Sequence, residues 1–114
     1  MRHPQRGDIW FVDLEPVTGR EINKLRPVFI VSPQEINKLG LTLIAPITGG
    51  AAFDRNNGFT VPLTGLGLKT QGLVLCRQIR VVDLVKRKAR YEETVDQTIV
   101  EVVIAKITQI FALE

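Results

Sequence analysis

Ile9-Trp10-Phe11-Val12 and Val28-Phe29-Ile30-Val31 are two short apolar runs on either side of a polar segment, Thr18 to Pro27, in this chain of 114 residues. Their β-branched and aromatic residues are typical of buried strands, which we expect over residues 8–14 and 28–31. The segment between them is dense in charge. A charged loop held between two rigid strands is a common location for binding or catalysis, because the scaffold fixes the side chains that the loop presents.

Further strands are expected over residues 42–47, 59–63 and 73–83. Pro62 makes the second of these an edge strand, because proline donates no ladder hydrogen bond. The polar pair Arg77 and Gln78 interrupts the apolar pattern of the third. This order predicts a mainly β fold, in which a twisted and mostly antiparallel sheet curls into a small barrel.

Two helices complete the predicted fold. Ser32 as a cap and Pro33 as the first helical residue indicate a short helix that stops near Gly40. A longer C-terminal helix is expected to begin at Thr94, with apolar residues at helical spacing that pack on the sheet. Lys106 is the polar exception on that apolar stripe.

Length and composition indicate a single domain over residues 1–114, with residues 1–6 as a flexible tail. No apolar run approaches the roughly 20 residues that span a bilayer. The basic N-terminus is not followed by the apolar segment of a signal peptide. A cytoplasmic location without a membrane partner is therefore the default expectation.

The formal net charge of +3 is a weak indication of an anionic partner. The distribution of the charged residues is more informative than the net charge. Six basic residues gather in one short region with only Asp83 as an acidic neighbour: Arg77, Arg80, Lys86, Arg87, Lys88 and Arg90. The simplest interpretation of such a run is a solvated connection between a strand and a helix.

Several catalytic arrangements are missing from the sequence. The only histidine, His3, lies in the expected tail, so no Ser-His-Asp triad is predicted. No glycine-rich phosphate loop follows a strand and opens a helix. The single cysteine, Cys76, is interpreted as a small core residue and not as a nucleophile. Because the sequence shows no metal-ligand spacing, no cofactor is expected.

Metal-free RNA cleavage is a chemistry that these residues could support. The 2′-hydroxyl attacks the adjacent phosphorus, so one group must accept its proton and another must protonate the leaving 5′-oxygen. Cations must stabilise the added negative charge. Arginine, with a pKa above about 12, is a poor proton donor, but its guanidinium matches two phosphate oxygens.

Several motifs, taken together, carry a family resemblance. They are Arg6-Gly7-Asp8-Ile9-Trp10, Gly19-Arg20-Glu21 with Arg26-Pro27-Val28, Ala45-Pro46-Ile47-Thr48, Gly58-Phe59 and Gln78-Ile79-Arg80-Val81-Val82-Asp83. In this order and spacing they resemble the MazF and PemK/Kid family of endoribonuclease toxins. The resemblance covers nearly the whole chain, from about Arg6 to Phe111.

The resemblance implies an SH3-like barrel of the CcdB/PemK type that forms a homodimer. It implies sequence-specific, metal-independent cleavage of single-stranded RNA, often mRNA, to 2′,3′-cyclic phosphate and 5′-hydroxyl ends. It also implies a cognate antitoxin protein that covers the site and blocks growth inhibition by the toxin.

Individual roles are implied in the same way. Arg26 matches the family arginine implicated in catalysis, Thr48 a threonine that contacts the scissile phosphate, and Glu21 a loop glutamate important in some members. Gln78 matches a site glutamine. The expected RNA-binding residues are Arg20, Lys24, Arg77, Gln78 and Arg80.

The chain also departs from the family pattern. Ile22 and Asn23 stand where many members have glutamine and glycine. Leu75 and Arg77 stand where the PemK/Kid branch has the arginine and the aspartate that act as acid and base. The mechanism of that branch is therefore not transferred, and the identity of the general base stays open.

Two alternative functions stay open as well. CcdB-like proteins share the barrel but poison DNA gyrase through a C-terminal tryptophan, whereas this chain ends Phe111-Ala112-Leu113-Glu114. The second alternative is a relative that binds RNA without cleaving it, which Leu75 and Arg77 favour. The sequence does not reveal the RNA sequence recognised, because the loops expected to read bases, over residues 49–58 and 66–71, have no readable code.

Overall fold

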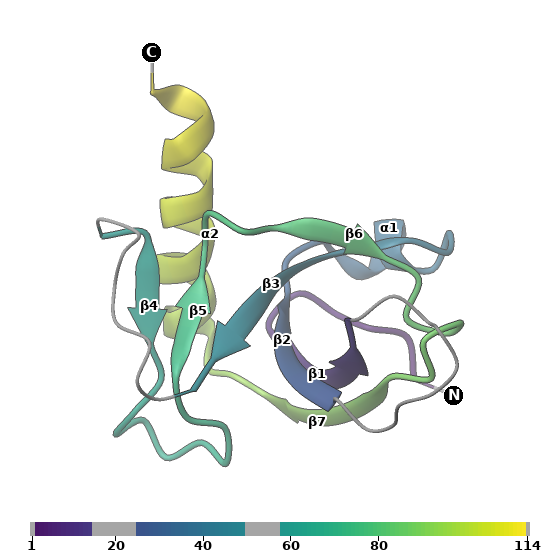
Figure 1. The fold of residues 1–114 in the computed structure, drawn as a ribbon. Helices are drawn as coiled ribbons and strands as arrows, with labels where there is room; N and C mark the ends of the chain where they lie inside the picture. Colours follow the sequence, from purple (N-terminus) through teal and green to yellow (C-terminus); the bar gives the residue numbers. More distant parts are fainter. Residues whose placement is uncertain (1, 15–24, 50–57, 114) are drawn as a thin grey trace.

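The computed structural model describes residues 2–14, 25–49 and 58–113. Its elements are β1 (Asp8–Asp13), β2 (Leu25–Ile30), α1 (Gln34–Asn37), β3 (Thr42–Thr48), β4 (Thr60–Pro62), β5 (Leu73–Leu75), β6 (Arg80–Val82), β7 (Arg90–Thr94) and α2 (Gln97–Ala112). All the strand pairs are antiparallel. In Figure 1, β1, β2, β3, β6 and β7 curl around one interior, and β4 and β5 lie beside α2. The expected mainly β, barrel-like fold with one C-terminal helix is confirmed.

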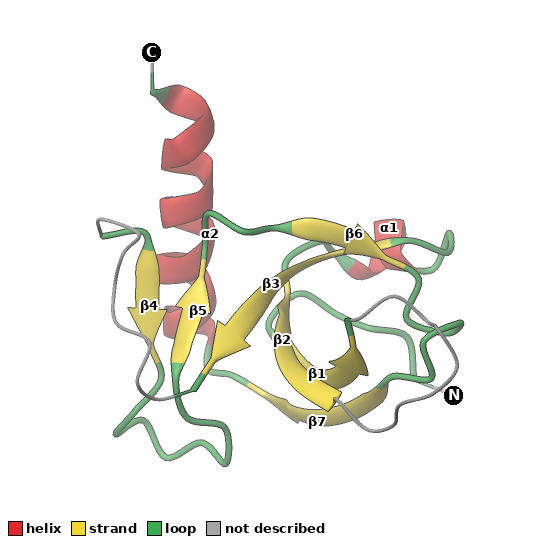
Figure 2. Cartoon of the chain, viewed as in Figure 1, coloured by secondary structure: helices red, strands yellow, loops and turns green. Residues whose placement is uncertain are grey.

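β3 belongs to both parts of the sheet. The strand order is β4-β5-β3-β2-β1-β7, and β6 also pairs with β3. The first half of β3 pairs with β6, and its last two residues, Ile47 and Thr48, pair with β5. Figure 2 shows β3 running from β6 at the barrel toward β5 beside the long helix.

The single strand that we expected over residues 73–83 is two short strands, β5 and β6. Between the pairs Ile47–Val74 and Ile44–Arg80, five residues (75–79) lie opposite only two (45 and 46) on β3. The excess of three residues forces the chain out of the ladder, as in a large bulge. Arg77 and Gln78, the polar interruption in the sequence, are exposed on this bend.

Two other strand predictions need correction. β2 begins at Leu25 and not at Val28, so Arg26 lies inside a strand, where it pairs with Val12. β7 was not expected, because residues 90–94 contain charged and polar side chains and no apolar run. Tertiary pairing with β1 makes this segment a strand in spite of that pattern.

Both helices begin later than expected. Pro33 is the N-cap of α1, and not its first residue, and α1 ends at Asn37 before a turn that reaches Gly40. The N-cap of α2 is Asp96. Thr94, the expected cap, is the last residue of β7, and its hydroxyl is used elsewhere.

The continuous apolar run of β2 is buried on both faces, as expected. Phe29 belongs to the core between the sheet and α2, where Val103 and Ile107 pack. Its neighbours Val28 and Ile30 belong to a second core inside the barrel. Successive side chains of a strand point to opposite faces, so a strand between two cores must be apolar at every position.

The polar exception on α2 has a partner. The ammonium group of Lys106 donates a hydrogen bond to the carbonyl oxygen of Gly58, 2.9 Å away. The helix also has exposed apolar side chains, since Val102 is 46% exposed and Phe111 is 72% exposed. Neither α1 nor α2, the two helices of the described residues, is long and apolar enough to cross a membrane.

A fully buried carboxylate, that of Asp8, joins the N-terminal segment to two strands. It accepts hydrogen bonds from the guanidinium of Arg2 (2.9 Å), the backbone N–H of Gln5 (3.0 Å), the indole N–H of Trp10 (3.1 Å) and the hydroxyl of Thr94 (2.9 Å). A buried carboxylate is stable only when its oxygens are bonded in this way.

Residues 2–6 are in contact with the body of the protein, in contrast to the flexible tail that we expected. Besides the bonds to Asp8, the guanidinium of Arg6 donates to the carbonyl oxygen of Val31 at 2.7 Å. The side-chain amide of Asn37 donates to the carbonyl oxygen of Pro4 at 2.9 Å. Polar side chains in a short segment gave no periodic signal, so the sequence pattern missed these contacts.

Asp8→Ala should lower the free energy of unfolding by about 3 kcal/mol, because it leaves the buried indole N–H of Trp10 and the backbone N–H of Gln5 without an acceptor. Urea unfolding monitored by circular dichroism measures the loss. Glu101→Ala, on the exposed face of α2, is the control and should change stability by less than about 0.5 kcal/mol. Equal losses in the two variants would contradict the role of Asp8.

Candidate active site

A cavity opens where β2 and β3 separate. The last pair between the two strands is Val28–Pro46; beyond it β2 continues with β1, and β3 continues with β5. Neither Pro27 nor Pro46 has an N–H group to extend the ladder. The resulting cavity measures about 530 Å³ and is lined by Leu14, Arg26, Pro27, Pro46, Ile47, Thr48, Gly49 and Gln71.

Arg26 and Thr48 enter this cavity from different strands. Arg26 lies on β2 with its side chain exposed, opposite Val12 of β1. Thr48 is the last residue of β3, half-buried, and pairs with Leu73 of β5. The structure therefore brings together a guanidinium and a hydroxyl that are 22 positions apart in the sequence. A guanidinium and a hydroxyl can both donate hydrogen bonds to an anion such as a phosphate.

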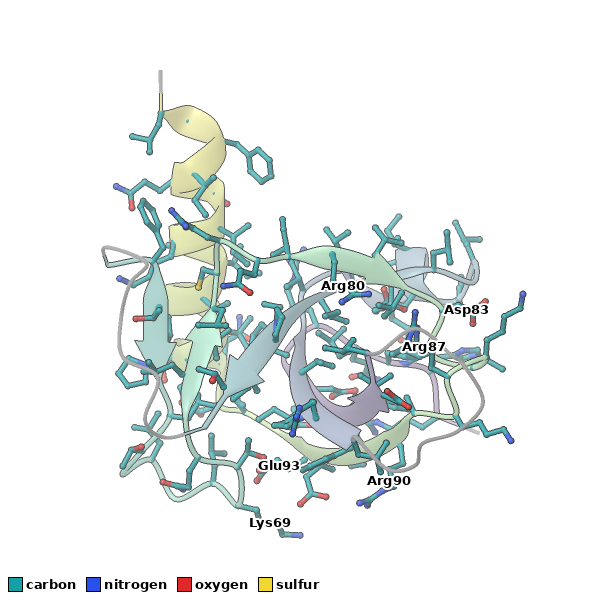
Figure 3. All side chains as sticks on the ribbon, in the orientation of Figure 1. Lys69, Arg80, Asp83, Arg87, Arg90 and Glu93 are labelled. Atoms are coloured by element: carbon teal, nitrogen blue, oxygen red, sulfur yellow. The ribbon has the colours of Figure 1, made fainter. Side chains whose placement is uncertain are left out.

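The other expected site residues do not line this cavity. Arg77 and Gln78 are exposed on the bend after β5, and Arg80 is exposed on β6, where Figure 3 labels it. Arg20, Glu21 and Lys24 lie outside the described residues. In the described part of the chain, no three His, Cys, Asp or Glu side chains are grouped as metal ligands.

Gly72 fixes the position of Thr48. A Cβ atom at Gly72 would lie 2.2 Å from the carbonyl oxygen of Thr48, and the φ angle of Gly72 is +118°. Only glycine satisfies both conditions without strain. The preceding loop, which includes Gln71, was expected to read bases, but no role was predicted for Gly72. A glycine directly before an apolar strand was the only available signal.

Glu93, for which no role was predicted, anchors the same loop to the barrel. Its carboxylate accepts hydrogen bonds from the backbone N–H of Lys69 (3.0 Å), the backbone N–H of Thr70 (2.8 Å) and the hydroxyl of Thr70 (2.7 Å). Figure 3 shows Glu93 and Lys69 on the same side of the molecule. The loop anchored in this way continues directly into Gln71, which lines the cavity, and Gly72.

A bulge accounts for the direction of Glu93. β7 pairs with β1 through Ile9–Glu93 and Trp10–Tyr91, so Glu92 is an extra residue on the β7 side. Bulges often redirect a side chain next to a functional site. The carboxylate of Glu93 is thereby available to the loop before β5.

Two pKa values reflect these surroundings. Partial burial alone would raise the pKa of Glu93, but the hydrogen bonds from Thr70 and Lys69 outweigh it and lower the pKa. Burial raises the pKa of the Cys76 thiol to about 11, partly offset by Lys106. The thiol of Cys76 is therefore protonated at neutral pH and buried in the core, where it serves packing and not nucleophilic attack.

The fold and the cavity together define a class of small barrel proteins with a C-terminal helix and a cavity, lined by an arginine and a threonine, at the junction of two parts of the sheet. Within that class, the chain belongs to the PemK-like, MazF-like toxins of type II toxin–antitoxin systems, whose family model matches residues 5–111.

Individual relatives agree with this assignment. Endoribonuclease PemK of Escherichia coli is 39% identical over 107 residues, which are 93% of this chain and 80% of that protein. Endoribonuclease toxin ChpB of Escherichia coli strain K12 is 44% identical over 87 residues, 75% of each chain. The crystal structure of MazF (Form-I) from Deinococcus radiodurans has the same fold, with a TM-score of 0.82 at 24% identity over 99% of this chain and 100% of that one.

Gly72→Ala should destabilise the protein by clearly more than about 2 kcal/mol, because the new methyl group collides with the backbone of Thr48 in addition to adopting a left-handed conformation. Gly67→Ala is the matched control: Gly67 also has a positive φ, of +79°, but no atom lies within 4 Å of a Cβ placed there. The control should lose only about 1–2 kcal/mol, the cost of the left-handed conformation. Equal losses of stability in urea unfolding would show that the close approach of Gly72 to Thr48 does not require glycine at this position.

Glu93 should stabilise the protein in a pH-dependent manner. Because its pKa is lower in the folded state, its contribution is present above the ordinary pKa of about 4.5 and is lost as the pH falls through the lowered value. Glu93→Gln should therefore be less stable than the unsubstituted protein at pH 7, with the difference shrinking toward pH 3. The measurement is urea unfolding across this range, with Glu92→Gln as control. A pH-independent difference would contradict the assignment.

Proposed function

We propose that the protein is a sequence-specific endoribonuclease toxin that cleaves single-stranded RNA, including mRNA, without a metal ion. The observation that carries this proposal is the meeting of Arg26 and Thr48 at one cavity in a chain of the PemK-like, MazF-like family. The names of the relatives PemK and ChpB as endoribonucleases support the reaction class.

In the proposed reaction, the scissile phosphate lies between the two donors. The guanidinium of Arg26 binds two phosphate oxygens and stabilises the charge that develops as the 2′-hydroxyl attacks phosphorus. The hydroxyl of Thr48 donates a hydrogen bond to the same phosphate. The bond to the 5′-oxygen breaks as that oxygen takes up a proton from water, which leaves a 2′,3′-cyclic phosphate and a 5′-hydroxyl end.

Glu21 is the proposed acceptor of the 2′-hydroxyl proton. The residues that line the cavity in the described ranges include no carboxylate and no histidine. The connection from β1 to β2, to which Glu21 belongs, leaves the described structure at Leu14 and returns at Leu25. Leu14 lines the cavity and Leu25 adjoins Arg26, so both ends of that connection are at the site.

The remaining expected contacts bind the RNA away from the reacting phosphate. Arg77, Gln78 and Arg80 are exposed on one continuous segment, from the bend after β5 into β6. They are proposed to bind the RNA backbone, together with Arg20 and Lys24 of the connection from β1 to β2. Phosphate contacts of this kind position a nucleic acid without reading its sequence.

Two protein partners complete the proposal. The family's place in type II toxin–antitoxin systems supports a cognate antitoxin that covers the cavity. A second copy of the chain is proposed to form a homodimer, which is consistent with the exposed apolar side chains of Val102 and Phe111 on α2. The proposed location is the cytoplasm, where mRNA is available.

The purified protein should cleave a long single-stranded RNA in the presence of EDTA, and Arg26→Ala should reduce the rate by at least about 100-fold. Arg26 is exposed on β2, so the variant should keep its thermal stability. Sequencing of the products gives the cleavage sites and the chemistry of the ends.

Arg80→Ala removes an exposed arginine outside the cavity and is the matched control. It should raise KM while leaving kcat within a few-fold, because a distant phosphate contact binds substrate and transition state alike. Cleavage that requires a divalent metal, or that survives Arg26→Ala, would refute the mechanism. Salt-dependent RNA binding by the unsubstituted protein without cleavage would favour a relative that has lost catalysis.

A further inference from the structure

A second cavity, of about 460 Å³, lies at the end of the barrel where the N-terminal segment crosses it. It shares no lining residue with the cavity of Arg26 and Thr48. Its walls come from residues 2–4, the end of α1, Trp10 of β1, the turn between β6 and β7, and the start of β7. The proposed reaction uses none of these residues.

The lining of this second cavity is strongly basic. It includes five basic side chains and no acidic one: Arg2, His3, Lys38, Lys88 and Arg90. Arg2 is neutralised by its ion pair with Asp8. Within the described ranges, Lys38 and Lys88 have no carboxylate in ion-pair contact. Their charges are therefore available to an anionic ligand.

Lys88 is held at the rim in an unusual conformation. Its φ of +53° is the only positive φ of a non-glycine residue in the described part of the chain. The backbone hydrogen bond from Lys88 to Val85 closes this turn, and the guanidinium of Arg87 ties it to the carbonyl oxygen of Asp13 at 2.7 Å. A left-handed lysine costs folding free energy and is typical of sites that clamp a ligand.

Most of the remaining lining is apolar or aromatic, with Asn37 and Thr42 as the polar exceptions. The rings of Trp10 and Tyr91 meet edge to face at 6.0 Å, and the guanidinium of Arg2 stacks on Tyr91 at 4.1 Å. Val85, at the rim, is 76% exposed although it is apolar. A ligand that uses both features needs a negative charge and a flat apolar surface. A nucleotide has both.

We propose that this second cavity binds a nucleotide of single-stranded RNA that flanks the cleaved step, with its phosphate on Lys88 and its base against the Trp10–Tyr91 wall. The assignment to RNA rests on the proposed function. Trp10 lines this cavity, and Leu14 lines the cavity of Arg26 and Thr48. The two residues are four positions apart, which is about 13 Å along an extended chain. Figure 3 shows Arg87 and Arg90 on this side of the barrel, away from α2.

Trp10 is the only tryptophan of the chain, so its fluorescence reports directly on this cavity. The test titrates the full-length protein with adenosine 5′-monophosphate, inorganic phosphate, an oligoglutamate peptide and a 2′-O-methyl oligouridylate. AMP contains no phosphodiester and the methylated strand has no attacking hydroxyl. The result is therefore independent of whether the protein cleaves RNA.

Lys88→Gly removes the ammonium group and keeps the backbone, because glycine accepts a positive φ. Lys86→Ala, in the same turn but outside the cavity lining, is the control with the same net charge. AMP should change Trp10 fluorescence saturably, and Lys88→Gly should weaken its binding about fivefold. For the oligouridylate, the slope of log affinity against log salt should fall by about 0.7. Lys86→Ala should change neither value.

Three results would overturn the proposal. Fluorescence that no nucleotide changes saturably would show that the cavity is not a binding site for them. Inorganic phosphate binding as tightly as AMP would remove the role of the base. Oligoglutamate binding more tightly than AMP, with Lys88→Gly weakening it, would assign the cavity to an acidic peptide.

Discussion

The pairing of β3 with three strands, β2, β5 and β6, is the constraint on which the rest of the structure depends. β3 joins the barrel to the part of the sheet that α2 covers, so one strand must follow two different directions. The ladder between β2 and β3 ends at Pro46, next to Pro27, and the cavity opens at that point. The break in regular hydrogen bonding and the candidate site are therefore the same feature.

Residues outside the cavity lining hold its walls in place. The carboxylate of Glu93 fixes the loop that carries Gln71 and Gly72, and the absence of a side chain at Gly72 lets that loop meet the end of β3. At the opposite end, the buried carboxylate of Asp8 joins the N-terminal segment to β1 and β7. Polar groups with satisfied hydrogen bonds thus position the strands that the apolar cores alone would leave free to shift.

The sequence predicted the apolar strands, the edge strand at Pro62 and the C-terminal helix, because periodicity and proline chemistry act locally. It did not predict β7, whose polar residues become a strand only by pairing with β1, nor the bend at Arg77, which arises from unequal lengths of two paired segments. The charge-dense segment indicated Arg26 as a candidate site residue, and the family motifs added Thr48. The role of Glu93 was not predicted, because a glutamate that accepts hydrogen bonds from backbone N–H groups of a distant loop leaves no local sequence pattern.

The most direct test of the central claim, that the cavity between β2 and β3 holds the reacting phosphate, is a crystal structure with a non-cleavable RNA. The RNA would lack the attacking 2′-hydroxyl at the cleavage site mapped on a long substrate. The scissile phosphate should lie within hydrogen-bond distance, about 3 Å, of both the Arg26 guanidinium and the Thr48 hydroxyl. A scissile phosphate bound elsewhere, with the Arg26 side chain in solvent, would contradict the account.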